Sequence, residues 1–252
     1  MKTVVRASKP WIKNLVYTIA SSLFYRRGVA KVINNAKMRF PLAYSRYYPH
    51  DYEPLKQEFI EKYAQGICVD LGAHIGLYTV LLSRQATQVI AFEPTTYTRN
   101  ILKQTITLNE CTNVLIREEA VADKSIKRNF YDTGEKVSNA NSFAPIGNPI
   151  LVQTISLDEL NLKIDFLKVD IEGAELFALK GAVNSLKFLK YMTLEIHPSL
   201  LNQLGQQVSE IFELLKSFQP QYYLEGVLVN VDHLNKIENF FEVNVILNGA
   251  RV

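Results

Sequence analysis

An acid and two glycines stand where a nucleotide-binding loop would begin. Asp70 comes at the end of a short apolar run, and Gly72 and Gly76 bound the loop that follows it. Gly72 permits a tight turn against a ligand, and Gly76 permits close packing of the next helix. A dinucleotide loop has Gly-x-Gly-x-x-Gly so that pyrophosphate can reach a helix N-terminus. This loop lacks the middle glycine and follows an acid, so it favours S-adenosylmethionine, a cationic ligand without phosphate.

A second acid supports an adenosine-bearing cofactor. Glu93 ends the next apolar run, 21 residues beyond Gly72. A carboxylate at about this separation accepts hydrogen bonds from ribose hydroxyls. Residues around the loop, around Glu93 and after the third predicted strand complete the expected set. The cofactor-binding residues expected from the sequence are Asp70, Gly72, Ala73, His74, Gly76, Thr79, Glu93, Glu119 and Ala120.

Two further apolar runs end in residues that could carry a reaction. Asp170 follows the run 164–169, and Glu195 and His197 share one face at the end of the run 191–196. If these runs are neighbouring parallel strands, the three side chains converge at the carboxyl edge of the sheet. His197 could then act as a general base towards a hydroxyl group. Alternatively, the three residues could bind a divalent metal that lowers the pKa of that hydroxyl. The base is the favoured interpretation.

Acids just after Asp170 have a simpler explanation. Glu172 and Glu175 lie near the start of a predicted helix, where the helix dipole favours negative charge. This preference alone accounts for both residues, so neither is assigned to the reaction.

From residue 66 onward, short apolar runs alternate with helical patterns. Strands are expected over 67–71, 88–92, 114–117, 127–131, 151–155, 164–169, 191–196, 222–224, 227–229 and 241–247. Helices are expected over 55–63, 75–84, 96–109, 174–189 and 209–218. Such alternation predicts an α/β fold with a mostly parallel sheet covered on both faces, and the strand-rich tail predicts an antiparallel edge.

The N-terminal segment differs in charge from the rest of the chain. Residues 1–50 hold ten of the 28 Lys and Arg residues and no Asp or Glu, so the remaining 18 basic residues face 25 acidic ones. We predict a basic, helical extension over 1–60, with a helix over 11–36, and a main domain over 61–252. An anionic membrane surface, an acidic substrate or the acidic body of the protein could be its partner. No apolar run reaches 18 residues, so we expect a cytoplasmic protein with peripheral membrane contact through residues 1–46.

Three stretches resemble the FkbM family of methyltransferases: Val69–Thr79, Phe92–Pro94 and Leu167–Glu175. The resemblance extends over about residues 63–199, and the Asp-x-Glu-Gly-x-Glu element that starts at Asp170 is its most specific part. It implies a seven-stranded Rossmann-like class I fold and methyl transfer from S-adenosylmethionine, typically to a hydroxyl oxygen. The family often has Asn at the position of His74.

The acceptor is less well defined by the sequence. A polar loop over 137–149 and the tyrosines at 44, 47, 48 and 52 are candidates to cover or line its pocket, although ordinary packing is the favoured explanation of the tyrosines. We predict O-methylation of a hydroxyl on a sugar, a lipid or a secondary metabolite. A non-catalytic binding module is an alternative. A nucleic-acid methyltransferase is disfavoured, because the acids from Asp170 onward replace the motif typical of base methylation and would repel phosphates.

Overall fold

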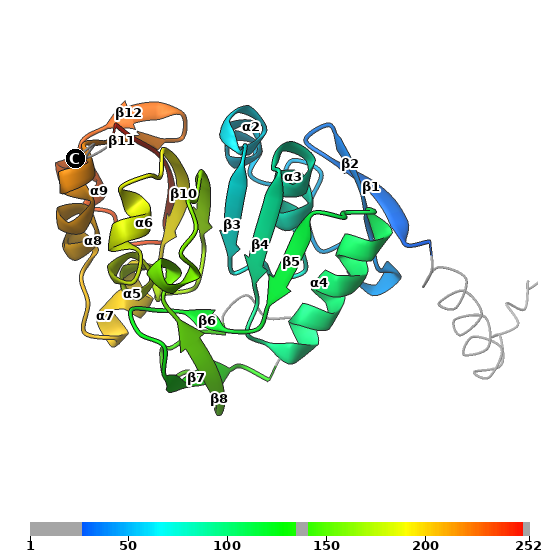
Figure 1. Cartoon of the computed structure of the whole chain (residues 1–252), viewed down its shortest axis with the longest axis horizontal. Coiled ribbons are helices and arrows are strands. Elements are labelled where there is room, and N and C mark those ends of the chain that lie inside the picture. Colours follow the sequence, from blue (N-terminus) through cyan, green and yellow to red (C-terminus); the bar gives the residue numbers. More distant parts are fainter. Residues whose placement is uncertain (1–26, 135–140, 249–252) are drawn as a thin grey trace, which may run out of the picture.

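The structure, a computed structural model, describes residues 27–134 and 141–248 (Figure 1). Its strands are β1 (Val29–Ile33), β2 (Ala36–Phe40), β3 (Ile67–Leu71), β4 (Gln88–Phe92), β5 (Val114–Arg117), β6 (Ala120–Val121), β7 (Lys127–Asp132), β8 (Asn148–Ile155), β9 (Phe166–Val169), β10 (Tyr191–Ile196), β11 (Pro220–Leu224), β12 (Val227–Val229) and β13 (Phe241–Leu247). Its α-helices are α2 (Pro54–Tyr63), α3 (Leu77–Gln85), α4 (Thr96–Leu108), α5 (Glu175–Lys180), α6 (Val183–Leu186), α7 (Pro198–Gln203), α8 (Val208–Leu215) and α9 (Val231–Leu234).

The central sheet has eight strands in the order β12-β11-β13-β10-β9-β3-β4-β5. Strands β10, β9, β3, β4 and β5 are parallel, whereas β13, β11 and β12 pair antiparallel at one edge. This confirms the predicted α/β fold with a mostly parallel sheet and an antiparallel edge. It also makes β9 and β10 neighbours, with β9 beside β3, so the loops that follow these three strands share one edge of the sheet.

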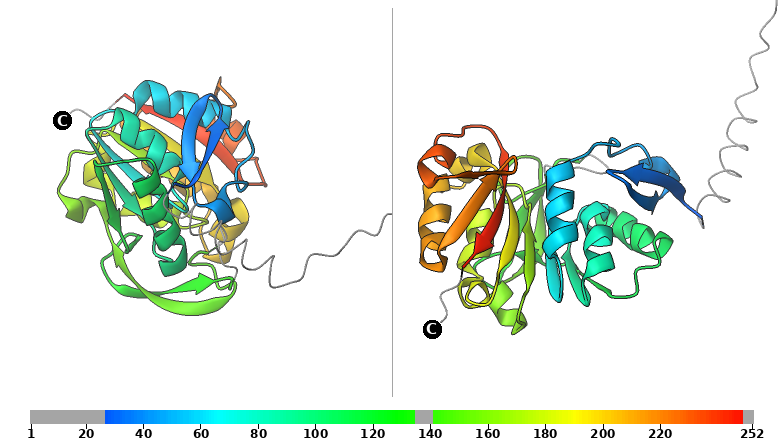
Figure 2. Two further views of the ribbon diagram at one scale, coloured as in Figure 1. Left: turned by 90° about the vertical axis from the view of Figure 1, so that its right-hand side faces the viewer. Right: turned by 90° about the horizontal axis from the view of Figure 1, so that it is seen from above.

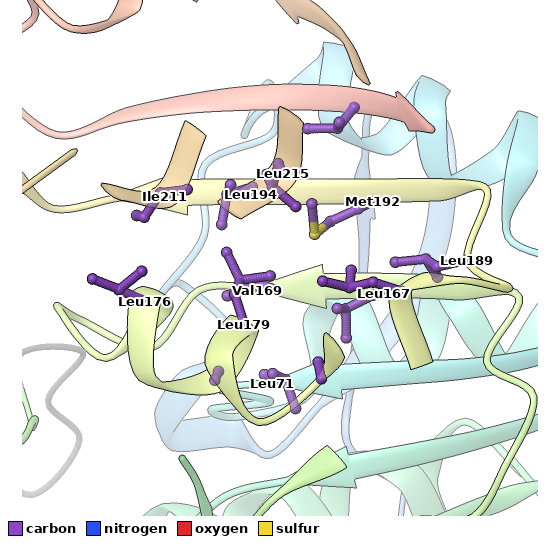
Figure 3. Packing of buried hydrophobic residues seen from close by; sticks show 14 of the residues in the cluster. Leu71, Leu167, Val169, Leu176, Leu179, Leu189, Met192, Leu194, Ile211 and Leu215 are labelled. Carbon is purple, nitrogen blue, oxygen red and sulfur yellow. The ribbon is translucent and has the colours of Figure 1, made fainter. Parts of the chain in front are cut away.

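The sheet is buried on both faces. On one face, Leu176 of α5 and Ile211 and Leu215 of α8 pack against Val169 and Leu194 of the strands (Figure 3). The opposite face is covered by α2, α3 and α4, whose apolar side chains share a second core cluster with residues from 33–40. Parallel strands that are buried on both faces need apolar side chains on both faces, which explains why β3 and β4 are nearly continuously apolar.

A small second sheet lies next to the carboxyl edge of the main sheet. It has the order β6-β8-β7, with β6 parallel and β7 antiparallel to β8. Phe130 of β7 and Phe143 form an edge-to-face pair, with ring centroids 5.5 Å apart, inside this layer. The sequence predicted β7 and β8 but did not predict their partner β6.

The predicted helix over 11–36 is wrong in its described part. Residues 29–40 form a β-hairpin, β1–β2, that lies beside α4 (Figures 1 and 2). Asn34 and Asn35 both have positive φ, at 44° and 72°, which is the backbone of a type I′ hairpin turn. On β2, buried Met38 and Phe40 alternate with exposed Lys37 and Arg39, a period of two rather than a helical one. Residues 1–26 of the predicted helix and extension lie outside the described residues.

The predicted helix over 174–189 is interrupted. It forms two short helices, α5 and α6, on either side of Gly181. A Cβ atom at Gly181 would lie 2.2 Å from the carbonyl oxygen of Ala122, so the chain turns here in close contact with the segment after β6. In the described residues, no helix is long and apolar enough to cross a membrane.

Candidate active site

The loop after β3 makes the tight turn that its glycines predicted. Gly72 has φ +75°, and a Cβ atom there would lie 1.9 Å from the carbonyl oxygen of Asp170. His74 has φ +50°, a left-handed conformation that Asn, Asp and His adopt more readily than other residues with side chains. This explains why His can replace the Asn that is common in the family.

Asp70 supports the loop from below. It is fully buried, accepts a hydrogen bond of 2.6 Å from the Thr79 hydroxyl, and lies 3.2 Å from the ammonium group of Lys168. Gly76 packs against α4, where a Cβ atom would lie 2.8 Å from Leu102. None of these three predicted cofactor residues, Asp70, Gly76 and Thr79, is among the residues that line the cavity described next. They hold the loop in place.

A cavity lies at the carboxyl edge of the sheet. Six of the predicted cofactor residues line it, and these are Gly72, Ala73, His74, Glu93, Glu119 and Ala120. Apolar and aromatic side chains that share the lining include Leu71, Phe92, Val121 and Phe143. Asp170 and Glu195, two of the three residues predicted to carry the reaction, line the same cavity. Eight residues predicted from the sequence therefore line one cavity. They come from the ends of β3, β4, β9 and β10 and from the segment after β5.

Glu93 is held rigidly at the end of β4. One carboxylate oxygen accepts the amide of Thr95 at 2.9 Å, and the other accepts the amide of His74 at 3.1 Å. Burial raises the pKa of Glu93 to about 7, although these hydrogen bonds oppose the shift. A buried carboxylate with remaining acceptor sites suits a ligand that brings hydroxyl donors.

His74 presents a neutral imidazole to the cavity. Burial lowers its pKa to about 4, and its Nδ1 atom lies 3.2 Å from the hydroxyl of Tyr48. The Nε2 atom is buried and has no hydrogen-bond partner among the residues that the structure describes. A buried polar atom of this kind normally has a partner, which a ligand in the cavity would provide.

The acidic end of the cavity is formed by Asp170, Glu172 and Glu195. Burial raises the pKa of Glu172 to about 8, with Asp170 and Glu195 adding to the shift and His197 opposing it. Burial and the charge of Asp170 also raise the pKa of Glu195. The pKa of Asp170 is lowered, because Lys168 and Lys56 outweigh the effect of its burial.

His197 stands behind these carboxylates. Its Nε2 atom is 3.3 Å from Glu172 and 3.6 Å from Glu195, and its Nδ1 atom is 2.9 Å from the fully buried Glu175. Burial alone would lower the pKa of His197, but Glu175, Glu172 and Asp170 together raise it to about 9. The imidazole is therefore charged at neutral pH, and the described lining of the cavity does not include it.

Glu172 lines the cavity, although the sequence analysis assigned it no role in the reaction. It does not belong to α5, which begins only at Glu175, so a helix dipole does not explain it. Its φ of +51° is unusual for a residue with a side chain, and Gly173 follows with φ +91°. Left-handed residues of this kind concentrate at functional sites, where surrounding structure holds them. This local strain is not readable from the sequence, although the Glu-Gly pair after a buried strand was a visible signal.

Two buried lysines neutralise part of the acidic end. Lys56 of α2 is 1% exposed and contacts Glu53, Glu195 and Glu242. Lys168 of β9 is equally buried and contacts Asp70 and Asp170. The sequence analysis assigned neither lysine a role. A charged residue inside the apolar run of β9 was nevertheless a signal, because a buried lysine is rare unless it is paired.

Tyrosines from the N-terminal segment complete the cavity. Tyr47, Tyr48 and Tyr52 line it, whereas Tyr44 bonds to Tyr97 elsewhere. The sequence favoured ordinary packing for these residues and left pocket lining open. Tyr48 does both, because it is 6% exposed and packs its ring against Phe40 of the hairpin. Of the polar loop predicted to cover the pocket, Asn141 lines the cavity, and residues 135–140 lie outside the described residues.

Two groups of side chains have the spacing of metal ligands. One consists of Asp170, Glu172 and His197, whose ligand atoms lie within 4.8 Å of one another. It differs from the predicted set in having Glu172 in place of Glu195. The other consists of Glu53, Glu195 and Glu242, and the ammonium group of Lys56 contacts all three. A metal at the second group would therefore have to displace Lys56 from all three carboxylates, whereas in the first group only Asp170 contacts a buried lysine, Lys168.

Comparison with known proteins identifies the family of the chain. Residues 70–222 match the family model described as the methyltransferase FkbM domain. The chain is 30% identical over 133 residues to the hexuronic acid methyltransferase AglP of Haloferax volcanii, a match that covers 51% of this chain and 54% of that protein. The chain thus spans about half the length of the curated relative that it matches.

Solved structures show weaker likeness. An rRNA methylase from Streptococcus thermophilus is 13% identical, with a TM-score of 0.48 and coverage of 77% of this chain and 94% of that chain. A precorrin-6y C5,15-methyltransferase from Geobacter metallireducens is 14% identical, with a TM-score of 0.43 and coverage of 80% and 90%. These values are too low to bear on function.

Proposed function

The chain belongs to the FkbM family of S-adenosylmethionine-dependent methyltransferases, and from this premise we propose that it methylates a hydroxyl oxygen of a sugar. The observation that carries the proposal is the composition of one cavity. Its lining joins the glycine loop and Glu93, which suit an adenosine-bearing cofactor, to an acidic end at Asp170, Glu172 and Glu195. The similarity to a hexuronic acid methyltransferase favours a sugar over a lipid or another metabolite as acceptor.

The cofactor would extend along this cavity. Glu93 would accept hydrogen bonds from the ribose hydroxyls, and Glu119 and Ala120 would border the adenine. The methionine part would then follow the loop from Gly72 to His74 and bring the sulfonium towards Asp170. A sulfonium and an ammonium group are both positive, so the excess of carboxylates at that end would favour them.

Methyl transfer needs little covalent help from the protein. The acceptor oxygen attacks the methyl carbon while the bond from carbon to sulfur breaks, so the three atoms must be held in line. As the new bond forms, the hydroxyl proton has to leave. The cavity must therefore provide a position for the oxygen and an acceptor for its proton.

Glu172 is better placed than His197 to receive that proton. Glu172 lines the cavity, whereas His197 lies behind it with its charge held by Glu175 and Glu172. With a pKa of about 8, Glu172 matches the range that suits a general base near neutral pH. We propose that Asp170 and Glu195 orient the acceptor and that His197 positions Glu172. This revises the role that the sequence suggested for His197.

A divalent metal is the alternative for the same end of the cavity. Asp170, Glu172 and His197 could hold it through two carboxylate oxygens and one imidazole nitrogen. The donor set fits, because Glu175 contacts Nδ1 of His197 and leaves Nε2 directed at the carboxylates, as in many metal-binding histidines. When bound, the metal would lower the pKa of the acceptor hydroxyl.

Methyl transfer from labelled S-adenosylmethionine tests the proposal. The protein is incubated with glycans and lipids of the source cell, and the position of the label is found by mass spectrometry. We expect label on a sugar oxygen and strong loss of transfer in Asp170→Asn. Parallel reactions with a chelator and with added Mn²⁺ separate the two mechanisms. Cofactor binding without transfer to any acceptor would favour the non-catalytic alternative.

A further inference from the structure

We infer that the acceptor site discriminates by charge and takes a neutral or amino sugar rather than one with a carboxylate next to the site of methylation. The inference rests on the proposed function and deepens it, since it concerns which sugar the same cavity accepts. It also separates this chain from its relative that is named for a hexuronic acid. The reason is that, in the described part of the chain, the cations at the acidic end are all occupied by carboxylates.

The only Lys or Arg among the described residues that line the cavity is Lys168. An ammonium group has three hydrogen-bond donors. The Nζ atom of Lys168 already has four oxygens within 3.4 Å, from the carboxylates of Asp70 and Asp170 and the carbonyls of Leu71 and Gly72. No donor is left for a substrate carboxylate.

Lys56 is equally committed. Three carboxylates surround its ammonium group, with Glu195 at 3.1 Å and Glu53 and Glu242 closer still. Its remaining neighbour is the ring of Tyr78, whose centroid is 4.8 Å away. To serve an anionic substrate, Lys56 would have to leave a partly buried carboxylate, which would lose its cation.

Three other described cations near the cavity have carboxylate partners. Arg128, whose guanidinium lies over the ring of Phe143, has Asp123 at 3.8 Å. Arg117 contacts Glu119, and Arg99 contacts Glu118 and the carbonyl oxygens of Glu93 and Pro94. His74 is neutral because burial lowers its pKa to about 4. None of these groups provides an unpaired positive charge at the acidic end.

The acidic end as a whole has more carboxylates than cations. Seven described carboxyl groups lie in or next to the acidic end, and two lysines and one histidine of the described residues oppose them. The raised pKa of Glu172, about 8, keeps that group largely protonated at neutral pH, which leaves six carboxylates against three cations. The seven carboxyl groups are those of Glu53, Asp70, Asp170, Glu172, Glu175, Glu195 and Glu242. A sugar carboxylate would add another negative charge, whereas sugar hydroxyls can donate hydrogen bonds and an ammonium group can also neutralise charge.

The tyrosines suit the rest of such an acceptor. Tyr47 and Tyr52 line the same cavity and offer ring surface for the apolar face of a sugar. They come from residues 47–52, outside the part of the chain that matches the family model. The match to the family therefore does not determine this part of the cavity.

Matched triplets of methyl hexosides test the inference. Within each triplet the sugar differs only at carbon 6, which carries a hydroxyl, an ammonium or a carboxylate group. Transfer of label from S-adenosylmethionine is measured for the full-length protein, with chelator and with added Mn²⁺. We expect kcat/KM for the carboxylate sugar to be at least tenfold below that for its hydroxyl and ammonium counterparts, since repulsion between like charges costs several kcal/mol.

A variant links the effect to the acidic end. Glu195→Gln removes one charge but leaves Lys56 two carboxylate partners, so we expect the discrimination ratio to fall at least threefold. Glu118→Gln, whose side chain is 76% exposed, is the matched control and should leave the ratio unchanged. Thermal unfolding checks that both variants fold.

Two results would overturn the inference. One is a carboxylate sugar that is methylated as well as its neutral counterpart, with or without metal. The other is transfer to none of the neutral or amino sugars. Calorimetric binding of S-adenosylmethionine and a search for transfer to other acceptors report separately on the proposed function, so the two ideas can fail independently.

Discussion

Glu93 should make cofactor affinity depend on pH. In the free protein, burial raises the pKa of Glu93 from 4.5 to about 7. Its contribution to folding stability is therefore fully present below about pH 4.5 and is lost as pH rises through 7. Two ribose hydroxyls that donate to the carboxylate would favour its ionised form and bring the pKa back down. Binding should then tighten as pH rises.

The magnitude follows from the shift. Full return to the ordinary pKa would couple binding to ionisation by about 3 kcal/mol, or roughly 100-fold to 300-fold in affinity. Between pH 6 and pH 8 the ionised fraction of the free protein rises from about one tenth to about nine tenths. The dissociation constant for S-adenosylmethionine should therefore fall about tenfold over this range.

Titration calorimetry at pH 6, 7 and 8 measures this dependence. We expect Glu93→Gln to bind weakly and with no rise in affinity over this range, because the glutamine cannot ionise. His197→Gln is the matched control, since His197 does not line the cavity, and it should keep the pH dependence. A Glu93→Gln variant that binds as tightly as the parent, or that keeps the same slope with pH, would refute the ribose assignment.

Three further outcomes are expected. Asp170→Asn and His197→Ala should lower kcat more than they weaken cofactor binding; a selective loss of cofactor binding would place the acceptor elsewhere. Lys168→Met should lower the free energy of unfolding by about 3–5 kcal/mol because it leaves buried charge unpaired, whereas Lys180→Met, which breaks a half-exposed pair, should cost at most about 1 kcal/mol. Equal costs in urea unfolding would contradict the account of the buried pair. Deleting residues 1–26 should reduce sedimentation with anionic vesicles, and unchanged sedimentation would exclude a membrane role for that segment.

The sequence predicted the parts of the fold that repeat a simple pattern. Strands β3, β4, β5 and β10 have the predicted bounds, because each is a short apolar run between turn residues. The hairpin β1–β2 was missed because its apolar residues were fitted to a helical period, although the Asn34-Asn35 pair is a strong turn signal.

The candidate site was predictable where a residue stands at a strand end. Glu93, Asp170 and Glu195 reached the cavity because parallel strands deliver their last residues to one edge. What the sequence could not give was the side chains that arrive from other elements. Lys56 comes from a helix 139 residues before its partner Glu195, and no local pattern connects two such residues.

The raised pKa of His197 also depends on side chains that arrive from other parts of the chain. A histidine at a strand end suggests a value near neutrality, whereas the carboxylates of Glu172 and Glu175 raise it to about 9. Their effect depends on distances of about 3 Å that only the folded chain creates. Perturbed groups at a cavity are candidates for function, but which of them meets the substrate is a question of geometry.

A crystal structure with bound S-adenosylhomocysteine tests the central claim most directly, because that claim concerns how the cofactor is oriented in the cavity. We predict that the ribose hydroxyls bond to the carboxylate of Glu93 and that the sulfur faces Asp170 and Glu172, with room beside it for the acceptor. A ligand whose ribose lies away from Glu93, or whose sulfur points away from the acidic end, would contradict the account.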